Sequence, residues 1–334
     1  MNHPHLLSSL RCYPARFSIK AAHLALLCLP FLQTHAAQRT QDPWSLVETH
    51  AAIEVAHKGN LVLRYHKQQV VAPTGMDASV GMSGFVHPLR TLQGVTVTED
   101  FAEDHPHHSG LWSAWANTSI AGRSVDFWNL HKREGRVEHR EVLWIDADLP
   151  AFQVRKVFVD LTPGQPTDRL EEIWSFCNFQ LEQEGWSFEI HCRQRLIGDE
   201  PVTLEVYPYG GLSLRFPDTW NAANGNEESI TVCNDAGQDR FESNQQLARW
   251  ILTTGTLEAQ PVSVLSMMHP ESMRFPQALR YHPTMPYFVW TMPSRNPFTF
   301  EHDTHYQSRF RYHIADAILQ PAAAAMAFAR YQEQ

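Results

Sequence analysis

Alternation of apolar and polar residues along short stretches is the feature that most restricts the fold of this chain. The clearest stretch reads Trp186-Ser187-Phe188-Glu189-Ile190-His191-Cys192-Arg193. Because successive side chains of a strand point to opposite faces, it predicts a strand with Trp186, Phe188, Ile190 and Cys192 on its buried face. Similar alternation is found at residues 61–65, 95–98, 153–159, 202–207, 212–216, 262–266, 287–292 and 310–314.

Turn-forming clusters such as Thr162-Pro163-Gly164 separate these stretches, and helical periodicity is almost absent. This pattern predicts an all-β protein built as one large antiparallel β-sandwich. The exception is the tail after Pro321, where residues 322–329 favour a short helix. No repeat, linker or shift in composition divides the chain, so we expect a single domain over residues 37–334.

The first 36 residues have the composition of a secretory signal peptide. Arg11, Arg16 and Lys20 precede an apolar run at residues 21–32, and small residues follow at Ala36 and Ala37. The apolar run is shorter than the roughly 20 residues that a membrane-spanning helix requires. We therefore expect residues 1–36 to be removed and the mature protein to be periplasmic or extracellular.

The charge balance excludes nucleic acid as a partner. The whole chain has a formal net charge of −9, and the leader contains basic residues but no acidic ones, so the remainder is more acidic still. Such a surface repels phosphate backbones and anionic lipids.

No later segment reaches spanning length, and no nucleotide, dinucleotide, serine-hydrolase or zinc-protease motif is present. We therefore expect no membrane span and no organic cofactor.

A segment rich in histidine is the strongest candidate for chemistry. It reads Glu103-Asp104-His105-Pro106-His107-His108. Imidazoles donate and accept protons near neutral pH and also ligate divalent metals, so His105, His107 and His108 are the candidate catalytic residues. An extended backbone would direct His105 and His107 to one side and His108 to the other. Two alternatives are a loop braced by its histidines and a site for a divalent metal.

Four further residues, together with Asp104, are candidates for binding a substrate: Asp126, Trp128, Tyr209 and Arg215. An aromatic face beside a carboxylate suits a sugar ring, which has apolar C–H faces and polar hydroxyls. Arg215 would clamp a carboxylate or a hydroxyl. The alternatives are a buried core position for Trp128 and a structural salt bridge for Arg215.

Later histidines offer candidates to complete this site. His269 and His282 stand beside turn-forming prolines, and either could approach the histidine segment in space. His302 and Asp303 are expected at the surface, where charged residues are usually found.

Three motifs together resemble a known family. They are the stretch from His87 through Asp104-His105-Pro106-His107-His108 to Trp112, the segment Asp126-Phe127-Trp128, and the segment Tyr209-Gly210-Gly211-Leu212-Ser213-Leu214-Arg215-Phe216. The chain resembles the uncharacterised bacterial PmoA-like family, also labelled methane oxygenase PmoA and domain of unknown function 6807. The resemblance implies a supersandwich similar to galactose-mutarotase-like, sugar-active folds. Members commonly have a basic residue where this chain has Ser109.

The methane label conflicts with the sequence, because the membrane-bound methane enzyme is built on spanning helices. We therefore interpret the chain as an exported carbohydrate-active protein in which histidines move protons, as in an epimerase, lyase or hydrolase. The alternatives are a carbohydrate-binding protein without catalysis and a histidine-ligated metalloprotein. Any of these would have a carbohydrate or sugar-derived small molecule as its partner.

Overall fold

Apart from residues 95–98, the period-two stretches form antiparallel strands, which the described residues arrange in three sheets. The computed structural model describes residues 44–225 and 229–334, which belong to one compact unit, so the predicted leader lies outside the described residues. The largest sheet has nine strands in the order β1 (Trp44–Glu48), β2 (Ala52–His57), β3 (Asn60–His66), β4 (Phe85–Leu89), β5 (Leu111–Ala114), β13 (Gly211–Arg215), β19 (Tyr287–Thr291), β18 (Gln277–Tyr281) and β15 (Gln246–Ala248).

The second sheet has eight strands, in the order β14 (Ile230–Asn234), β16 (Trp250–Leu257), β17 (Gln260–Met268), β21 (His305–Ala315), β11 (Gly185–Leu196), β10 (Thr167–Glu182), β9 (Ala151–Asp160) and β8 (Gly135–Asp146). A small sheet contains β20 (Phe298–Phe300), β12 (Val202–Leu204), β6 (Thr118–Ile120) and β7 (Arg123–Val125). Short 3₁₀ turns occur at Ala78–Val80, Leu130–Lys132, Asp218–Trp220, Ala222–Asn224 and Met292–Ser294.

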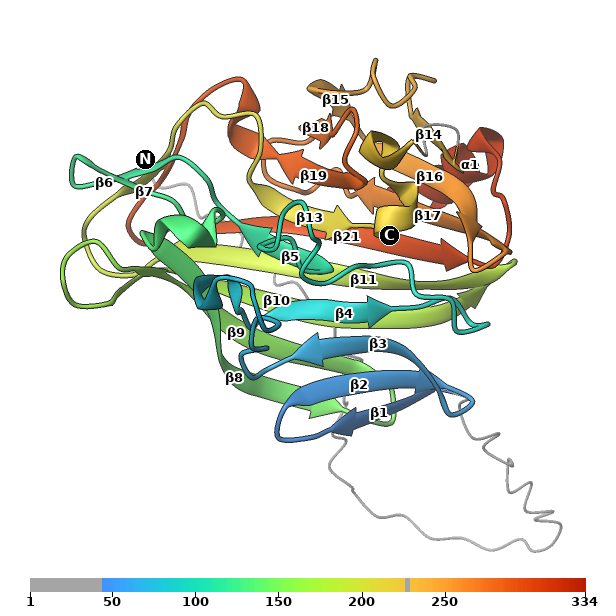
Figure 1. Cartoon of the computed structure of the whole chain (residues 1–334), viewed down its shortest axis with the longest axis horizontal. Coiled ribbons are helices and arrows are strands. Elements are labelled where there is room, and N and C mark those ends of the chain that lie inside the picture. The colour runs from blue at the N-terminus through green and yellow to red at the C-terminus, as the bar shows by residue number, and fades with distance from the viewer. Residues whose placement is uncertain (1–43, 226–228) are drawn as a thin grey trace, which may run out of the picture. The chain divides into compact units, whose positions relative to one another are not determined.

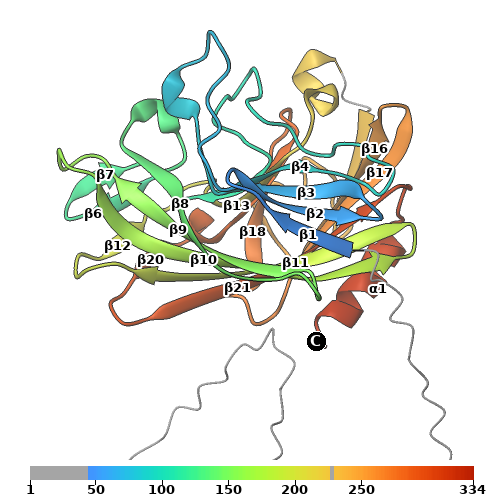
Figure 2. The same ribbon diagram turned by 90° about the horizontal axis from the view of Figure 1, so that it is seen from below.

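The prediction of a large antiparallel β-sandwich is confirmed. Figures 1 and 2 show the two large sheets as layers, with β8 to β11 and β21 on one side of β1 to β4. Side chains from both sheets meet in one apolar core, in which Leu212 and Leu214 of β13 join Phe188 and Ile190 of β11. Burial of this apolar area is the main contribution to the stability of the fold.

Two local predictions have different outcomes. The tail helix is confirmed as α1 (Pro321–Tyr331), which packs against β16 and β17 (Figure 1). The prediction of a strand at residues 95–98 is wrong, because this stretch contributes only the isolated bridge Arg90↔Thr96. The hydroxyl of Thr98 accepts the N–H of Leu89 at 3.0 Å, so a side chain replaces a backbone carbonyl and a regular ladder cannot form.

Alternation in β13 and β19 determines where the candidate site lies. Leu212 and Leu214 point into the core between the two large sheets, so Ser213 and Arg215 point to the opposite face. Arg215 is paired in register with Tyr287 of β19, which therefore shares that face. Among the described residues, no helix is long and apolar enough to cross a membrane.

Candidate functional site

The three candidate histidines belong to a coiled loop between β4 and β5. The loop is closed at its base by the Gly110 N–H, which donates to the Glu99 carbonyl at 2.7 Å. Gly110 has φ +60°, and a Cβ there would lie 2.0 Å from the Val86 carbonyl oxygen, so only glycine fits.

The prediction of an extended backbone is wrong for this loop. The His105 N–H donates to Ala102 and the His108 N–H donates to His105, which bends the chain into successive turns. The three imidazoles therefore gather on one side: ring centroids lie 5.6 Å apart for His105 and His107, 5.0 Å for His105 and His108, and 4.8 Å for His107 and His108.

The three histidines differ in how far their side chains are buried. His107 and His108 are 6% and 2% exposed, whereas the His105 side chain is 36% exposed. Burial lowers the pKa of His107 to about 3, and the neighbouring His105 and His131 add to the shift. Burial also lowers the pKa of His108 well below its usual value. Only His105 is substantially accessible, so the two buried rings are neutral near pH 7 and support it.

This burial predicts a pH dependence of stability. Below pH 6.5 the unfolded chain gains a proton at His107 that the folded chain binds only near pH 3, so the free energy of unfolding falls as the pH is lowered through this window. At pH 4.5, two units below the ordinary histidine pKa, the loss from His107 alone should be about 2.7 kcal/mol, at roughly 1.4 kcal/mol for each pH unit. Urea unfolding of the wild type and of His107→Gln at pH 7 and pH 4.5 measures this loss in the free energy of unfolding. Equal acid sensitivity of the two proteins would contradict the prediction.

Asp104 and Arg215, predicted as separate substrate contacts, form an ion pair. The Arg215 guanidinium is fully buried, and its Nη2 lies 2.8 Å from Asp104 Oδ1 and 3.3 Å from Asp218 Oδ1. The second oxygen of Asp104 lies 3.6 Å from His105 Nδ1. Burial opposes ionisation of Asp104, but His105 and Arg215 outweigh it and hold the pKa of this carboxyl well below its usual range. His105, Asp104 and Arg215 therefore form one chain of neighbouring polar side chains from the surface to the interior.

Glu99 is a member of this group that sequence reasoning missed. Burial raises the pKa of Glu99 to about 7; Arg215 opposes the shift, and the carboxylates of Asp218 and Asp104 add to it. Within the described chain, Glu99 Oε2, His105 Nδ1, His108 Nδ1 and Arg215 Nε are buried polar atoms without a hydrogen-bond partner. Since buried polar atoms are normally paired, such a group is typical of a functional site.

The face of the nine-stranded sheet supplies the floor beneath the loop. The Tyr287 ring lies 4.7 Å from His108 and stacks on His282 at 5.4 Å, and Arg280 Nε donates to its hydroxyl at 3.2 Å. Burial lowers the pKa of His282 to about 4, with Arg280 adding to the shift. His282 thus completes the group, whereas His302 is exposed and pairs with Asp199 and Asp303, as expected of a surface residue.

The aromatic candidates form a wall beside the histidines. Trp128 lies 5.7 Å from His108 and 5.3 Å from Tyr209, but its indole is only 2% exposed, which matches the alternative of a core position. Half-buried Tyr207 and Tyr209 remain nearer the solvent, with their hydroxyls 3.2 Å apart.

Asp126 is engaged in local structure. Its Oδ1 accepts the backbone N–H groups of Trp128 and Asn129 at 2.9 and 2.8 Å, and its Oδ2 lies 2.7 Å from Lys132 Nζ. These bonds hold the turn that presents Trp128, and both carboxylate oxygens of Asp126 take part in them.

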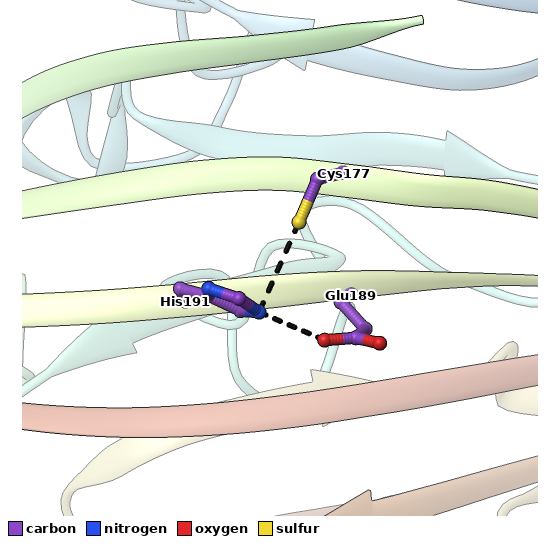
Figure 3. A group of neighbouring side chains, drawn as sticks. All are labelled: Cys177, Glu189 and His191. Carbon is purple, nitrogen blue, oxygen red and sulfur yellow. Dashed lines mark hydrogen bonds and ion pairs between the residues drawn. The ribbon is translucent and has the colours of Figure 1, made fainter. Parts of the chain in front are cut away.

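Three residues elsewhere could offer ligands to a metal. Cys177 of β10 and Glu189 and His191 of β11 direct their side chains toward one another (Figure 3), with ligand atoms within 4.8 Å of each other. His191 Nε2 lies 2.8 Å from Glu189 Oε2 and 3.8 Å from Cys177 Sγ. The Glu189 carboxylate, however, pairs with Arg311 and lies 3.5 Å from Arg309. Two guanidinium charges beside a shared carboxylate oppose a cation, so hydrogen bonding accounts for this group better than a metal does.

Comparison with protein families identifies the chain. The model of a family of unknown function, DUF6807, matches residues 52–329. The protein belongs to this DUF6807 family. The match includes the histidine loop and every floor residue of the candidate site, so these features lie inside the family's domain. No curated protein matches this sequence.

Solved structures similar to this DUF6807 protein are distant. A kojibiose phosphorylase from the human microbiome aligns with TM-score 0.34 and 8% identity, covering 81% of this chain but 29% of its own. The GalM/aldose epimerase homologue from C. elegans aligns with TM-score 0.34 and 9% identity over 82% of this chain and 99% of its own. Heparan sulfate lyase HepC from Pedobacter heparinus aligns with TM-score 0.29 and 8% identity, covering 80% of this chain and 34% of its own.

Proposed function

We propose that this DUF6807 protein is an exported carbohydrate-active enzyme that moves protons to and from a sugar at the His105 site. The observation that carries the proposal is the joining of an accessible imidazole, His105, through Asp104 to a buried arginine, Arg215. The backbone N–H of Glu99 donates to the Arg215 carbonyl at 3.1 Å, and the charge of Arg215 acts on the pKa of the Glu99 carboxyl. Groups whose environments push their pKa values apart are suited to serve as acid and base in one site.

Each residue then has a role that follows from its surroundings. His105 accepts a proton at its accessible ring, and the Asp104 carboxylate stabilises the imidazolium that forms. Glu99, with a pKa of about 7, is partly protonated near neutral pH and donates a proton. Arg215 maintains the negative charge of Asp104 and is not available to clamp a substrate carboxylate.

A sugar is the substrate class that the walls of the site favour. Tyr207 and Tyr209 offer apolar faces and hydroxyls, and His282 and Arg280 add polar groups on the floor. Apolar faces beside hydrogen-bonding groups match the two kinds of surface on a pyranose. Epimerisation, mutarotation and β-elimination all require proton transfer at carbon or ring oxygen, and these are the reactions that we favour over hydrolysis.

Export is proposed from the composition of residues 1–36 alone, which have the charged, apolar and small-residue regions of a signal peptide. The resemblance to the PmoA-like family likewise stays a prediction. Methane oxidation is not part of the proposal.

The test is a reaction screen that does not presuppose the chemistry. The protein is incubated in D₂O with aldoses, uronates and unsaturated or intact oligosaccharides, and proton NMR follows anomer exchange, deuterium incorporation and bond cleavage. We expect one class of carbohydrate to react with the wild type and not with His105→Gln.

The principal alternative is a carbohydrate-binding protein without catalysis, which the burial of His107, His108 and Trp128 favours. In the same screen it would broaden or shift ligand signals with no chemical change. That outcome, with equal binding by His105→Gln, would replace the enzymatic proposal.

A further inference from the structure

A cavity of about 200 Å³ lies between the eight-stranded sheet and α1, far in sequence from the histidine loop. Its floor is the sheet face that points away from the core, with Arg311 and His313 of β21, and α1 forms its wall. The polar lining residues are Gln180, Glu182, Arg311, His313, Arg330 and Gln334. Pockets for drug-sized ligands are roughly 300–1,000 Å³, so this cavity suits a molecule of about monosaccharide size.

Two nearly buried side chains, those of His313 and Arg311, line this space. His313 is 8% exposed, and its Nε2 has no hydrogen-bond partner within the described part of the chain. Arg311 is 5% exposed; its Nε lies 3.2 Å from Glu189 Oε1, and its Nη2 binds Glu189 and Gln334. A buried nitrogen without a partner in the lining of a polar cavity favours a hydrogen-bonding occupant, because buried polar groups are normally paired.

The cavity also contains one cation and one anion that lack a charge partner. Arg330 stands on the exposed side of α1 and makes no ion pair with any described residue. Glu182 accepts hydrogen bonds from Ser187 Oγ at 2.9 Å and Gln180 Nε2 at 3.3 Å, and it too pairs with no cation that the structure describes. A ligand that satisfies both must offer an anionic group to Arg330 and hydroxyl donors to Glu182.

We propose that this cavity binds a small polyhydroxylated carboxylate of about hexuronate size. Its carboxylate lies between Arg330 and Arg311, where guanidinium groups bind carboxylates through paired N–H donors. The His313 imidazole contributes a further hydrogen bond, and the ligand hydroxyls bind Glu182 and the amides of Gln180 and Gln334. This site is separate from the His105 group and does not depend on the enzymatic proposal.

Calorimetric titration of the full chain with D-glucuronate tests the assignment, with D-glucose as the matched neutral ligand. We expect glucuronate to bind at least tenfold more tightly than glucose and Arg330→Gln to weaken glucuronate binding at least tenfold. Because Arg330 is exposed, its replacement should leave the fold intact. His313→Phe, which fills the cavity, should abolish binding.

Two controls identify the site. Arg136→Gln changes an exposed arginine of β8 that pairs with Glu138 and should bind glucuronate like the wild type. His302→Gln, which changes an exposed histidine outside both sites, should also leave the affinity unchanged. Absence of glucuronate binding to the wild type, equal affinity for glucose, or an affinity that survives Arg330→Gln would each overturn the proposal.

Discussion

Replacing Lys156 by methionine should lower the free energy of unfolding by about 3–5 kcal/mol, because it leaves a buried carboxylate without its cation. The Lys156 and Glu172 side chains are 0% and 2% exposed, and Lys156 Nζ lies 2.8 Å from Glu172 Oε2. The two residues face each other in register on β9 and β10, and both point into the sandwich. Lys156 Nζ also donates to Ser113 Oγ at 3.0 Å and lies 3.2 Å from the centroid of the Trp174 ring.

The double variant Lys156→Met/Glu172→Gln is the matched control. The neutral amide keeps an acceptor for Gln194 Nε2, which donates to Glu172 Oε1 at 2.9 Å, but no longer leaves a charge unpaired. We expect it to recover at least about 2 kcal/mol of the loss, as measured by guanidinium unfolding. A single variant within about 1 kcal/mol of the wild type, or a double variant no more stable than the single, would contradict this account.

The buried pair also bears on the candidate site. Ser113 belongs to β5, and its neighbour Trp112 points to the opposite face, where its ring lies 5.1 Å from His108. Loss of the Lys156 contact would loosen the strand that supports the histidine loop. We therefore expect Lys156→Met to impair the site through this strand as well as by unfolding the protein.

His105→Gln should reduce kcat on the carbohydrate found in the screen by about 100-fold or more, with KM changed by less than about threefold. Removing a general base typically costs 10²–10⁴-fold in rate, and glutamine keeps the size and polarity of the side chain. His105 is substantially exposed, so the substitution should leave the fold intact. Steady-state kinetics measure both constants.

His302→Gln is the control for this prediction, since it changes an exposed histidine whose ion-pair partners are Asp199 and Asp303. It should behave like the wild type. An increase in KM with kcat unchanged in His105→Gln would indicate that His105 binds the sugar without taking its proton.

The sequence predicted the strands well because alternation is a local property. In β11 the four apolar residues face the core as expected, and Ser187, Glu189 and His191 face away from it. The stretch at residues 95–98 has the same pattern, yet a single hydroxyl, that of Thr98, replaces the backbone partner that a strand requires. When a side-chain hydroxyl takes the place of a backbone acceptor, the alternation of apolar and polar residues does not change, so the sequence pattern cannot reveal it.

The composition of the site was predictable only in part. His105 and Asp104 are neighbours in sequence, but His282 and Tyr287 reach them through the pairing of β13 with β5 and β19, which no local pattern specifies. Glu99 has an unremarkable sequence context, and its pKa of about 7 arises from burial near residues far along the chain. The burial of His107 and Trp128 depends on packing in the same way.

The protonation state of Glu99 tests the central claim most directly, since it requires no substrate. Carbon-13 NMR of the side-chain carboxyl groups, followed from pH 3 to pH 9 and assigned with Glu99→Gln, gives the pKa of this residue. We expect Glu99 to titrate near pH 7, well above the ordinary glutamate value of about 4.3. A Glu99 carboxyl that titrates between pH 4 and pH 5 would contradict the assignment of this site to proton transfer.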